Sequence, residues 1–342
     1  MRFKVLTRKK YVIILIPFVL LFLSALVVCP LIGSERISLS KALDFSMPIK
    51  GNPDAVILFY ARIPRCLLAL LVGAALASSG VTFQAMLKNP LATPYTLGLA
   101  GGSSLAAVMI IMFFDFIKWR FPLLQPIASF IGALATLGIV YKLGRRSGGF
   151  QHVTLILAGV TLNLFFSSLI LLIQYIADPA RTFFILHWLM GNLDFIRYDP
   201  VLLILPFQIT GMAILFYHAR AMNLLSLDEM SARSLGLDVP VVMRRLYIAS
   251  SLVAGSAIAF SGPIGFVGLI VPHAIRLMVG ADHRILLPAS FLAGGAFLIL
   301  CDTLARTVLA PTELPVGVIT ALLGGPFFLW LLLRQKKGGM AF

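Results

Sequence analysis

The stretch LLALLVGAALASSGVTFQAMLKNPLATPYTLG, residues 67–98, is an apolar run of helix length that ends in a polar break. A helix needs about 20 apolar residues to cross the hydrocarbon core of a bilayer, and the run before Lys88 meets that length. Lys88, Asn89 and two prolines then interrupt the pattern, and Gly98 closes it. The stretch therefore predicts a membrane-spanning helix followed by a turn, and it raises the question whether that turn is only a connection.

The composition extends the membrane prediction to the whole chain. Of the 342 residues, 60% are hydrophobic and only 12% are charged, whereas the apolar share of soluble domains is about 45–50%. A formal net charge of +15 would favour a nucleic-acid partner in a soluble protein, but here the basic residues lie at the ends of apolar runs. We therefore predict an all-α polytopic membrane protein that binds membrane lipid and no nucleic acid.

The chain divides into about ten apolar segments on this length criterion, within a single domain over residues 1–342. They are roughly residues 11–32, 62–84, 95–114, 122–143, 152–176, 199–218, 240–261, 265–279, 285–308 and 314–333. The first resembles a signal peptide with a lipidated Cys29, but it is too long and lacks a small residue just before that cysteine. We predict that it is the first of about ten transmembrane helices.

The distribution of basic residues predicts the orientation. An even number of spans puts both termini on one side of the membrane. When that side is taken as cytoplasmic, most of the 28 lysine and arginine residues fall on it, in agreement with the positive-inside rule. Both termini are therefore expected in the cytoplasm.

A shift of 182 positions reveals a weak internal repeat. It aligns GAALASSG (residues 73–80) with GSAIAFSG (residues 255–262), Pro90 with Pro272 and Gly98 with Gly280. Under the proposed orientation the two halves, residues 11–176 and 199–333, would be inverted copies, which is typical of transporters with interrupted helices. The alternative is that small residues recur because helices pack closely through them.

Motifs for enzyme chemistry are absent from the sequence. No Gly-Lys dipeptide occurs, so the phosphate-binding loop GxxxxGK[ST] is missing, and the five histidines lack metal-ligand spacing. The three cysteines occur singly in or beside apolar segments, which predicts packing rather than a disulfide framework. We predict no catalytic residue, no metal site and no ATP hydrolysis by this chain.

The longest connection on the cytoplasmic side, residues 219–240, contains a helix signature. Ser226 and Glu229 form a possible capping box, and Gly236 can end the helix in a left-handed conformation. This would place Leu227, Met230 and Leu235 on a short, partly apolar helix. Two interpretations remain open, a solvated loop and a docking helix for a cytoplasmic partner.

Polar residues also fall on one face of the fifth segment. Asn163, Ser167 and Gln174 lie at positions i, i+4 and i+11, within about 40° of one another on a helix. Because polar side chains facing lipid are costly, this face must turn to other helices or to a wet cavity. Interhelical hydrogen bonding and the lining of a transport pathway are both compatible with the pattern.

Charged residues near the opposite side of the membrane have competing interpretations. Asp302 could couple transport to protons, but Arg306 at i+4 favours a neutralised structural pair. Arg62 and Arg65 lie three residues apart at the outer end of the second segment. They could extend to the membrane interface, or they could bind carboxylates of an external partner.

Three long motifs resemble the FecCD-type permeases, the membrane subunits of ATP-binding cassette (ABC) importers for ferric siderophores, haem and cobalamin. They are RIPRCLLALLVGAALASSGVTFQAMLKNPLATPYTLGLAGG from residue 62, SGPIGFVGLIVPHAIRLMVGADHRILLP from residue 261, and CDTLARTVLAPTELPVGVITALLGGPFFLWLLL from residue 301. The resemblance covers about residues 62–333. It implies a type II importer fold with ten helices per subunit and inverted halves, in a bacterial inner membrane.

The resemblance also implies partners and sites. A second permease subunit, expected to be an identical copy, would complete a central pathway, and two cytoplasmic ATPase subunits would bind ATP and Mg²⁺, so that no cofactor is expected in this chain. An external substrate-binding protein would dock through its carboxylates. The implied docking residues are Arg62, Arg65 and Arg306, and the implied ATPase-coupling residues are Ser226, Glu229, Ala232, Leu235 and Gly236.

The rival hypothesis is an ion-coupled secondary transporter, which needs an unpaired acid inside the membrane. Asp302 is the clear candidate, and its proximity to Arg306 in sequence argues against that hypothesis. The sequence does not specify the cargo, the identity of the partner permease, the transport stoichiometry or the residues that line the pathway, for which Asn163, Ser167 and Gln174 are our candidates.

Overall fold

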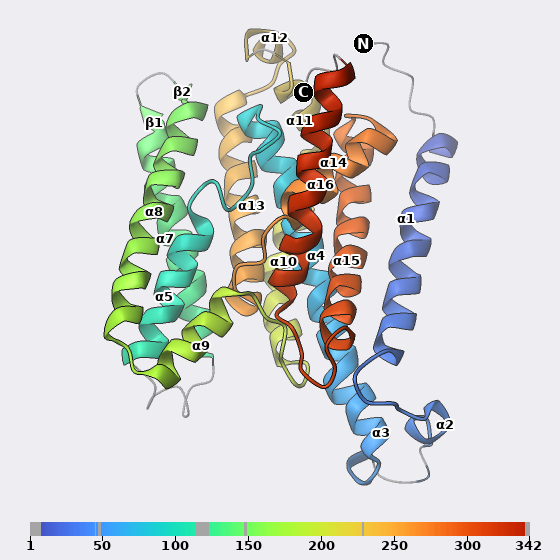
Figure 1. Ribbon diagram of the computed structural model, residues 1–342. Helices are drawn as coiled ribbons and strands as arrows, with labels where there is room; N and C mark the ends of the chain where they lie inside the picture. The colour runs from blue at the N-terminus through green and yellow to red at the C-terminus, as the bar shows by residue number, and fades with distance from the viewer. Residues whose placement is uncertain are drawn as a thin grey trace.

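The computed structural model describes residues 8–44, 46, 49–113, 123–146, 149–227 and 229–338. The principal helices cross the molecule side by side (Figure 1). They are α1 (Arg8–Val28), α4 (Ile63–Leu87), α5 (Leu99–Phe113), α7 (Leu124–Gly144), α8 (His152–Ile176), α10 (Asp199–Tyr217), α13 (Val239–Ser261), α14 (Val267–Val279), α15 (His283–Thr307) and α16 (Val316–Gly338). The all-α prediction of about ten membrane helices is confirmed.

Shorter elements connect these helices at the two ends of the molecule. They are the 3-10 turns Cys29–Leu31 and Ile49–Gly51, α2 (Leu39–Ala42), α3 (Pro53–Val56), a π-helical turn (Ile57–Arg62), α9 (Pro179–Leu189), α11 (Ala219–Leu225), α12 (Glu229–Ser234), and the antiparallel pair β1 (Arg145–Arg146) and β2 (Gly149–Phe150). Helix α1 begins and α16 ends at the end that carries α12, and α2 and α3 lie at the opposite end (Figure 1). We call these the α12 end and the α3 end.

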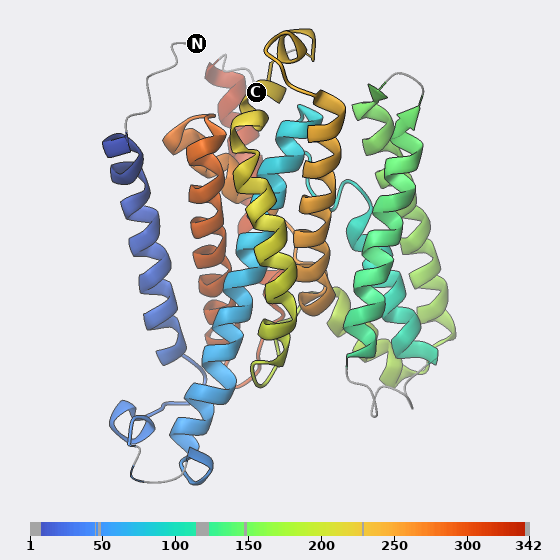
Figure 2. The same ribbon diagram turned by 180° about the vertical axis from the view of Figure 1, so that it is seen from behind.

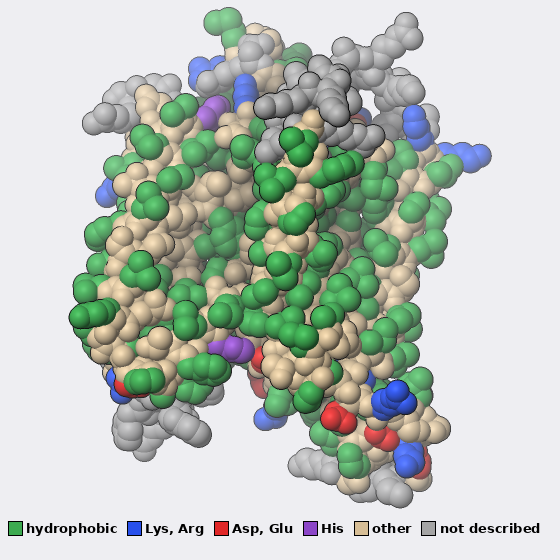
Figure 3. All heavy atoms as spheres, in the orientation of Figure 1, with side chains coloured by type: hydrophobic (Ala, Val, Ile, Leu, Met, Phe, Trp, Pro, Cys, Tyr) green, Lys and Arg blue, Asp and Glu red, His purple; other side chains and the backbone are tan. Residues whose placement is uncertain are grey.

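The surface is that of a membrane protein. Hydrophobic side chains cover the flanks of the helices, and the charged side chains in view gather at the two ends (Figure 3). On α8, for example, Leu157, Leu164 and Leu171 each expose about two thirds of their surface. Within the described residues, seven helices are long and apolar enough to cross a membrane, and three further apolar helices are shorter.

Helix α4 is the central element, with α10 and α13 seen beside it in Figure 2. In the helical stretch that ends with α4, 89% of the residues in its apolar part are buried, compared with 17% of those in α8. Glycines allow this burial. A methyl group on Gly80 would collide with the carbonyl oxygen of Gly268 in α14, and one on Gly73 with that of Gly294 in α15. Backbones in contact without intervening side chains are typical of close helix packing in membranes.

The residue-by-residue repeat predicted from sequence is wrong in its register. Gly80 lies in the middle of α4, whereas its counterpart Gly262 ends α13 with φ +64°. Pro90 lies between α4 and α5, whereas Pro272 lies inside α14. Close packing, the alternative interpretation, fits Gly73 and Gly80. It does not fit Gly280, where a methyl group would meet nothing within 4 Å. Helices α4 and α13 nevertheless run in opposite directions, as an inverted arrangement requires (Figures 1 and 2).

The two halves do share one feature, a helix that is too short to span the membrane. Helix α5 has 15 residues and α14 has 13, which gives lengths of about 22 and 20 Å against a hydrocarbon thickness of about 30 Å. The connections that precede them enter the protein from opposite ends. We call residues 88–98 the first re-entrant segment and residues 262–266 the second. They meet where the Tyr95 hydroxyl donates to the Ile264 carbonyl at 2.5 Å.

Replacement of Gly80 by alanine should lower the Tm of the purified protein. The added methyl group collides with the Gly268 carbonyl, and overpacking costs about 1–3 kcal/mol. The control is Gly138→Ala in α7, where a methyl group meets nothing within 4 Å and alanine is favoured by about 1 kcal/mol. Equal Tm values for the two variants in detergent would contradict the contact between α4 and α14.

Candidate functional site

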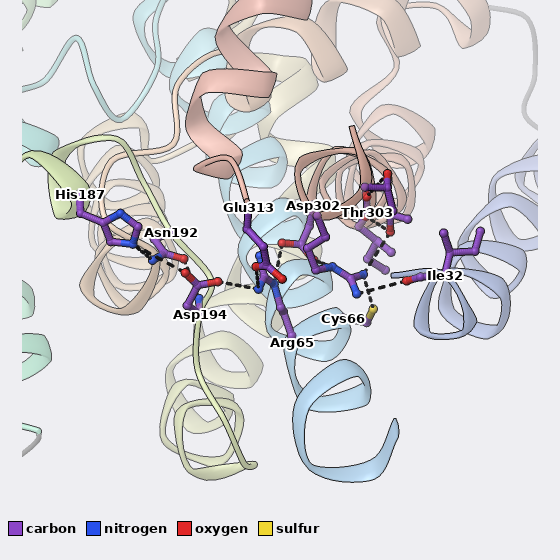
Figure 4. Close-up of polar contacts among 12 residues, drawn as sticks. Ile32, Arg65, Cys66, His187, Asn192, Asp194, Asp302, Thr303 and Glu313 are labelled. Carbon is purple, nitrogen blue, oxygen red and sulfur yellow. Dashed lines mark hydrogen bonds and ion pairs between the residues drawn. The ribbon is translucent and has the colours of Figure 1, made fainter. Parts of the chain in front are cut away.

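A buried carboxylate holds two arginines at the α3 end of the molecule (Figure 4). Asp302, near the end of α15, is fully buried. One of its oxygens accepts from Arg65 Nε at 2.9 Å, and the other accepts from Arg306 Nε at 3.1 Å. The predicted Asp302–Arg306 pair is thus confirmed. The second partner, Arg65 in the first turn of α4, joins α4 to α15 through charge.

Exposed carboxylates complete the coordination of Arg65. Its Nη1 lies 2.5 Å from Asp194, in the α9–α10 connection, and 2.6 Å from Glu313, in the α15–α16 connection. The side chains of Asp194 and Glu313 are 43% and 35% exposed, whereas that of Arg65 is 11% exposed. Asp194 also lies 3.6 Å from the Nε2 atom of His187 in α9. Arg65 therefore links two helices and two surface connections in one network.

The structure brings the three predicted docking arginines together but turns two of them inward. Arg62 is 5% exposed and donates to the carbonyls of Pro30, Leu31 and Glu35. The interfacial interpretation of Arg62 is therefore wrong. Its guanidinium binds carbonyl oxygens in the connection that follows α1, where helical partners are missing.

Arg306, like Arg62, binds a backbone carbonyl in the connection that follows α1. Its side chain is buried, and Nη1 donates to the carbonyl of Ile32 at 3.2 Å. All three arginines line a cavity of about 320 Å³ at the α3 end, together with Glu35, Asp194 and Glu313. Basic and acidic side chains are balanced there. Among the described residues, Arg65 is the docking candidate that is paired with two solvent-exposed carboxylates, those of Asp194 and Glu313.

The three predicted pathway residues lie together in a groove. Asn163, Ser167 and Gln174 line an open cavity of about 410 Å³, with Tyr95 and Leu189 among its other walls. The shared helix face is confirmed. Asn163 also satisfies backbone groups across the groove, since Nδ2 donates to the Tyr95 carbonyl at 2.5 Å and Oδ1 accepts from Gly101 N at 3.1 Å. The interhelical hydrogen bonding that we considered is therefore present at Asn163.

The predicted coupling residues lie after α11, in α12 and beside it, and the predicted capping box falls partly outside the described residues. Ser226 follows α11, and its hydroxyl donates to the Met222 carbonyl at 3.0 Å. Its backbone N–H also donates to the Met222 carbonyl, at 3.1 Å, so Ser226 belongs to the last turn of α11. The side chain of Glu229 lies outside the described residues, although its backbone begins α12. Gly236 has φ +84° and ends α12 as predicted.

Helix α12 stands at the edge of the molecule (Figure 1), and apolar side chains of this region are exposed. Met230 and Leu235 are 80% and 61% exposed, whereas Ala232 is buried. The helix is thus anchored by a small residue on one side and presents two large apolar residues on the other.

Three polar residues that the sequence interpretation missed fasten this region. Lys88 donates to the Leu227 carbonyl at 2.5 Å, and Asn223 donates to Asp282 at 2.8 Å. Burial tends to raise the pKa of Asp282, but hydrogen bonds from Arg284 and Asn223 outweigh it and lower the pKa to about 2. The partners are 139 and 59 residues apart, so no local pattern reveals them. In the sequence, the polar break that contains Lys88 was the available indication of such a contact.

Comparisons with known proteins agree with one another. The family model described as the FecCD transport family matches residues 18–334. The chain is 42% identical over 281 residues to the hemin transport system permease protein HmuU of Yersinia pestis, covering 81% of this chain and 83% of the relative. It is 41% identical over 297 residues to the cobalamin import system permease protein BtuC of Halobacterium salinarum, covering 86% and 78%.

A third relative and a solved structure extend over nearly the full length. The iron(3+)-hydroxamate import system permease protein FhuG of Bacillus subtilis is 33% identical over 337 residues, covering 97% of this chain and 100% of the relative. An inward-facing metal-chelate-type ABC transporter superposes with a TM-score of 0.80 at 35% identity, covering 95% of this chain and 99% of the solved one.

Replacement of Asp302 by asparagine should strongly destabilise the protein. It leaves the guanidinium groups of Arg65 and Arg306 in a buried site without their central counter-charge, and breaking a buried pair costs about 3–5 kcal/mol. The matched control is Asp178→Asn, at the exposed pair of Asp178 with Arg181, where about 0–1 kcal/mol is expected. Thermal unfolding measures both. A Tm loss no larger than that of the control would show that the triad is not stabilising.

Proposed function

Since the chain belongs to the FecCD transport family and is the permease subunit of an ABC importer, we propose that its cargo is a metal chelate, namely a ferric siderophore, haem or cobalamin. The observation that carries the proposal is the superposition over 95% of the chain on a metal-chelate-type ABC transporter. The names of the relatives, which include hemin, cobalamin and iron-hydroxamate permeases, support the same class. The chain would move the chelate inward, with the energy of ATP bound with Mg²⁺ on partner ATPases.

The permease is part of an ABC importer complex, and we propose that a second, identical permease subunit covers the α8 face. Only 17% of the residues in the apolar part of α8 are buried. The groove lined by Asn163, Ser167 and Gln174 of this helix is open. A second copy would close the groove and convert it into the wall of a central pathway. A polar stripe facing lipid would otherwise be costly.

The α12 end is proposed to be cytoplasmic and to contact the ATPase subunits. The excess of lysine and arginine assigned to this side supports the orientation. Exposed Met230 and Leu235 offer an apolar contact surface, while buried Ala232 and the left-handed turn at Gly236 fix the helix that carries them. Within this coupling segment, residues 219–240, Ser226 follows α11 and Glu229 begins α12.

At the α3 end, Arg65 is the proposed contact for an external binding protein. A carboxylate of that partner would replace exposed Asp194 or Glu313 at the guanidinium, while buried Asp302 keeps Arg65 in position. Charge-assisted bonds between arginine and carboxylate have the required strength and geometry. Arg62 and Arg306 would support the site by holding the connection after α1 beside it.

An ion-coupled mechanism is disfavoured by the same geometry. A proton-coupling acid needs an oxygen that can exchange its proton during transport. Both oxygens of Asp302 accept from arginine, at 2.9 and 3.1 Å. The pairing supports an energy source outside this chain.

Uptake into vesicles containing the assembled importer tests the function. Entry of a ferric siderophore, haem or cobalamin should require ATP on the ATPase side and should stop with vanadate, because closure of the ATPases drives the permease. An uncoupler should have no direct effect. Uptake that persists without the ATPases and collapses with the uncoupler would contradict the proposal.

The docking assignment predicts that Arg65→Gln weakens binding of the importer's substrate-binding protein about tenfold or more, since a charged hydrogen bond at the interface is lost. The control is Arg181→Gln, which removes an exposed arginine paired with Asp178 and away from the cavity. Binding is measured by surface plasmon resonance on importers in nanodiscs. Equal affinity for both variants, with assembly intact, would remove Arg65 from the docking surface.

A further inference from the structure

The meeting point of the two re-entrant segments is held by side chains rather than by helical hydrogen bonds. Tyr95 in the first segment donates to the Ile264 carbonyl of the second at 2.5 Å, and the Tyr95 carbonyl accepts from Asn163 of α8 at 2.5 Å. Non-helical backbone at membrane depth must find its partners within the protein. Three separate parts of the chain are thus joined at one tyrosine.

The first re-entrant segment is tied to the α12 end. It begins at Lys88, whose ammonium group donates to the Leu227 carbonyl in the α11–α12 connection at 2.5 Å. Lys88 itself has φ +47°, a left-handed conformation that is costly for a residue with a side chain. A displacement of the α11–α12 connection would therefore act on the segment at its most strained residue.

The second re-entrant segment is tied to the α3 end. Asn192 N donates to the Ser261 carbonyl at 2.8 Å, just before the segment. A methyl group on Gly191 would lie 2.9 Å from the side chain of Ile264. Two residues beyond Asn192, Asp194 pairs with Arg65. The segment therefore touches the same turn that supplies an exposed carboxylate to the arginine network.

The second segment also reaches α16 through a strained residue. Phe266 has φ +68°, and its ring occupies the space that a side chain at Gly324 of α16 would need. In the described part of the chain, three residues other than glycine have positive φ, namely Lys88, Arg197 and Phe266. Lys88 and Phe266 lie on either side of the meeting point of the two segments, which we call the junction. Strain that the surrounding structure maintains is frequent where a segment changes conformation.

We propose that Tyr95 is a positioning residue that transmits movement of the α12 end to the turn at Gly191–Asp194. Its hydroxyl is the direct hydrogen bond between the two re-entrant segments, each of which is fastened to one end of the protein. The segments lack helical hydrogen bonds of their own, so they can shift without breaking a helix. The inference rests on the proposed contact of residues 219–240 with the ATPase.

The test is hydrogen–deuterium exchange on the assembled importer in nanodiscs, with and without ATP and vanadate. In the wild type, nucleotide should change exchange in residues 219–238 and also in residues 186–198. Tyr95→Phe should keep the first change and reduce the second by about fivefold or more, the lower end of typical coupling between sites. We call the change in residues 186–198 the outer response and that in residues 219–238 the inner response. The measured quantity is the outer response relative to the inner one.

Tyr247→Phe is the matched control. Tyr247 is also buried, and its hydroxyl donates to the Leu137 carbonyl between α13 and α7 at 2.9 Å. Both substitutions remove one hydroxyl bonded to a backbone carbonyl and should lower Tm to a similar degree. Tyr247→Phe should leave both exchange responses at wild-type size, which separates loss of stability from loss of transmission.

Lys88→Met provides a second variant in case Tyr95→Phe does not assemble. It leaves the junction intact but removes the bond to Leu227, and it should reduce the outer response to the same extent. The proposal is overturned if either assembled variant behaves like Tyr247→Phe, or if the wild-type outer residues do not respond. Lack of any response in residues 219–238 of the wild type would instead contradict the proposed ATPase contact.

Discussion

Every backbone polar group at membrane depth must be paired within the protein, and this constraint shapes the fold around α4. Helices satisfy it along most of the chain, but α5 and α14 are short, and the segments before them run through the interior without helical bonds. The Tyr95 hydroxyl and the Asn163 amide donate additional hydrogen bonds to carbonyl groups of these segments. The same two side chains join the two segments to each other and to the groove of α8.

At the α3 end, backbone carbonyl groups are again paired with side chains, but here the side chains are charged. Arg62 and Arg306 are used to bind carbonyl groups that no helix satisfies, and Asp302 compensates the charge that this brings into the interior. Arg65 differs because its inner contact is buried and its outer contacts are exposed. A site of this kind keeps a fixed geometry while its outer ligands exchange.

The sequence was sufficient for features that depend on local spacing. Apolar length predicted the helices, i+4 spacing predicted the Asp302–Arg306 pair, and glycine chemistry predicted the left-handed turn at Gly236. It failed where the partner is remote or where one residue type serves two purposes. Arg65 and Asp302 are 237 residues apart. Ser226 is a residue type that often starts a helix, but its hydroxyl donates to the last turn of the preceding helix. Gly73 and Gly80 likewise contact neighbouring backbones, and their counterparts Gly255 and Gly262 do not occupy equivalent positions.

The contact between Gly80 and Gly268 has a consequence for how the subunit can move. Two backbones that touch without side chains between them cannot rotate past each other, because no rotamer is available to absorb the motion. We therefore expect α4 and α14 to move together, with α15 joined to them at the contact of Gly73 with Gly294. Movement that opens and closes a passage is then expected outside these three helices, in the re-entrant segments and in exposed helices such as α8.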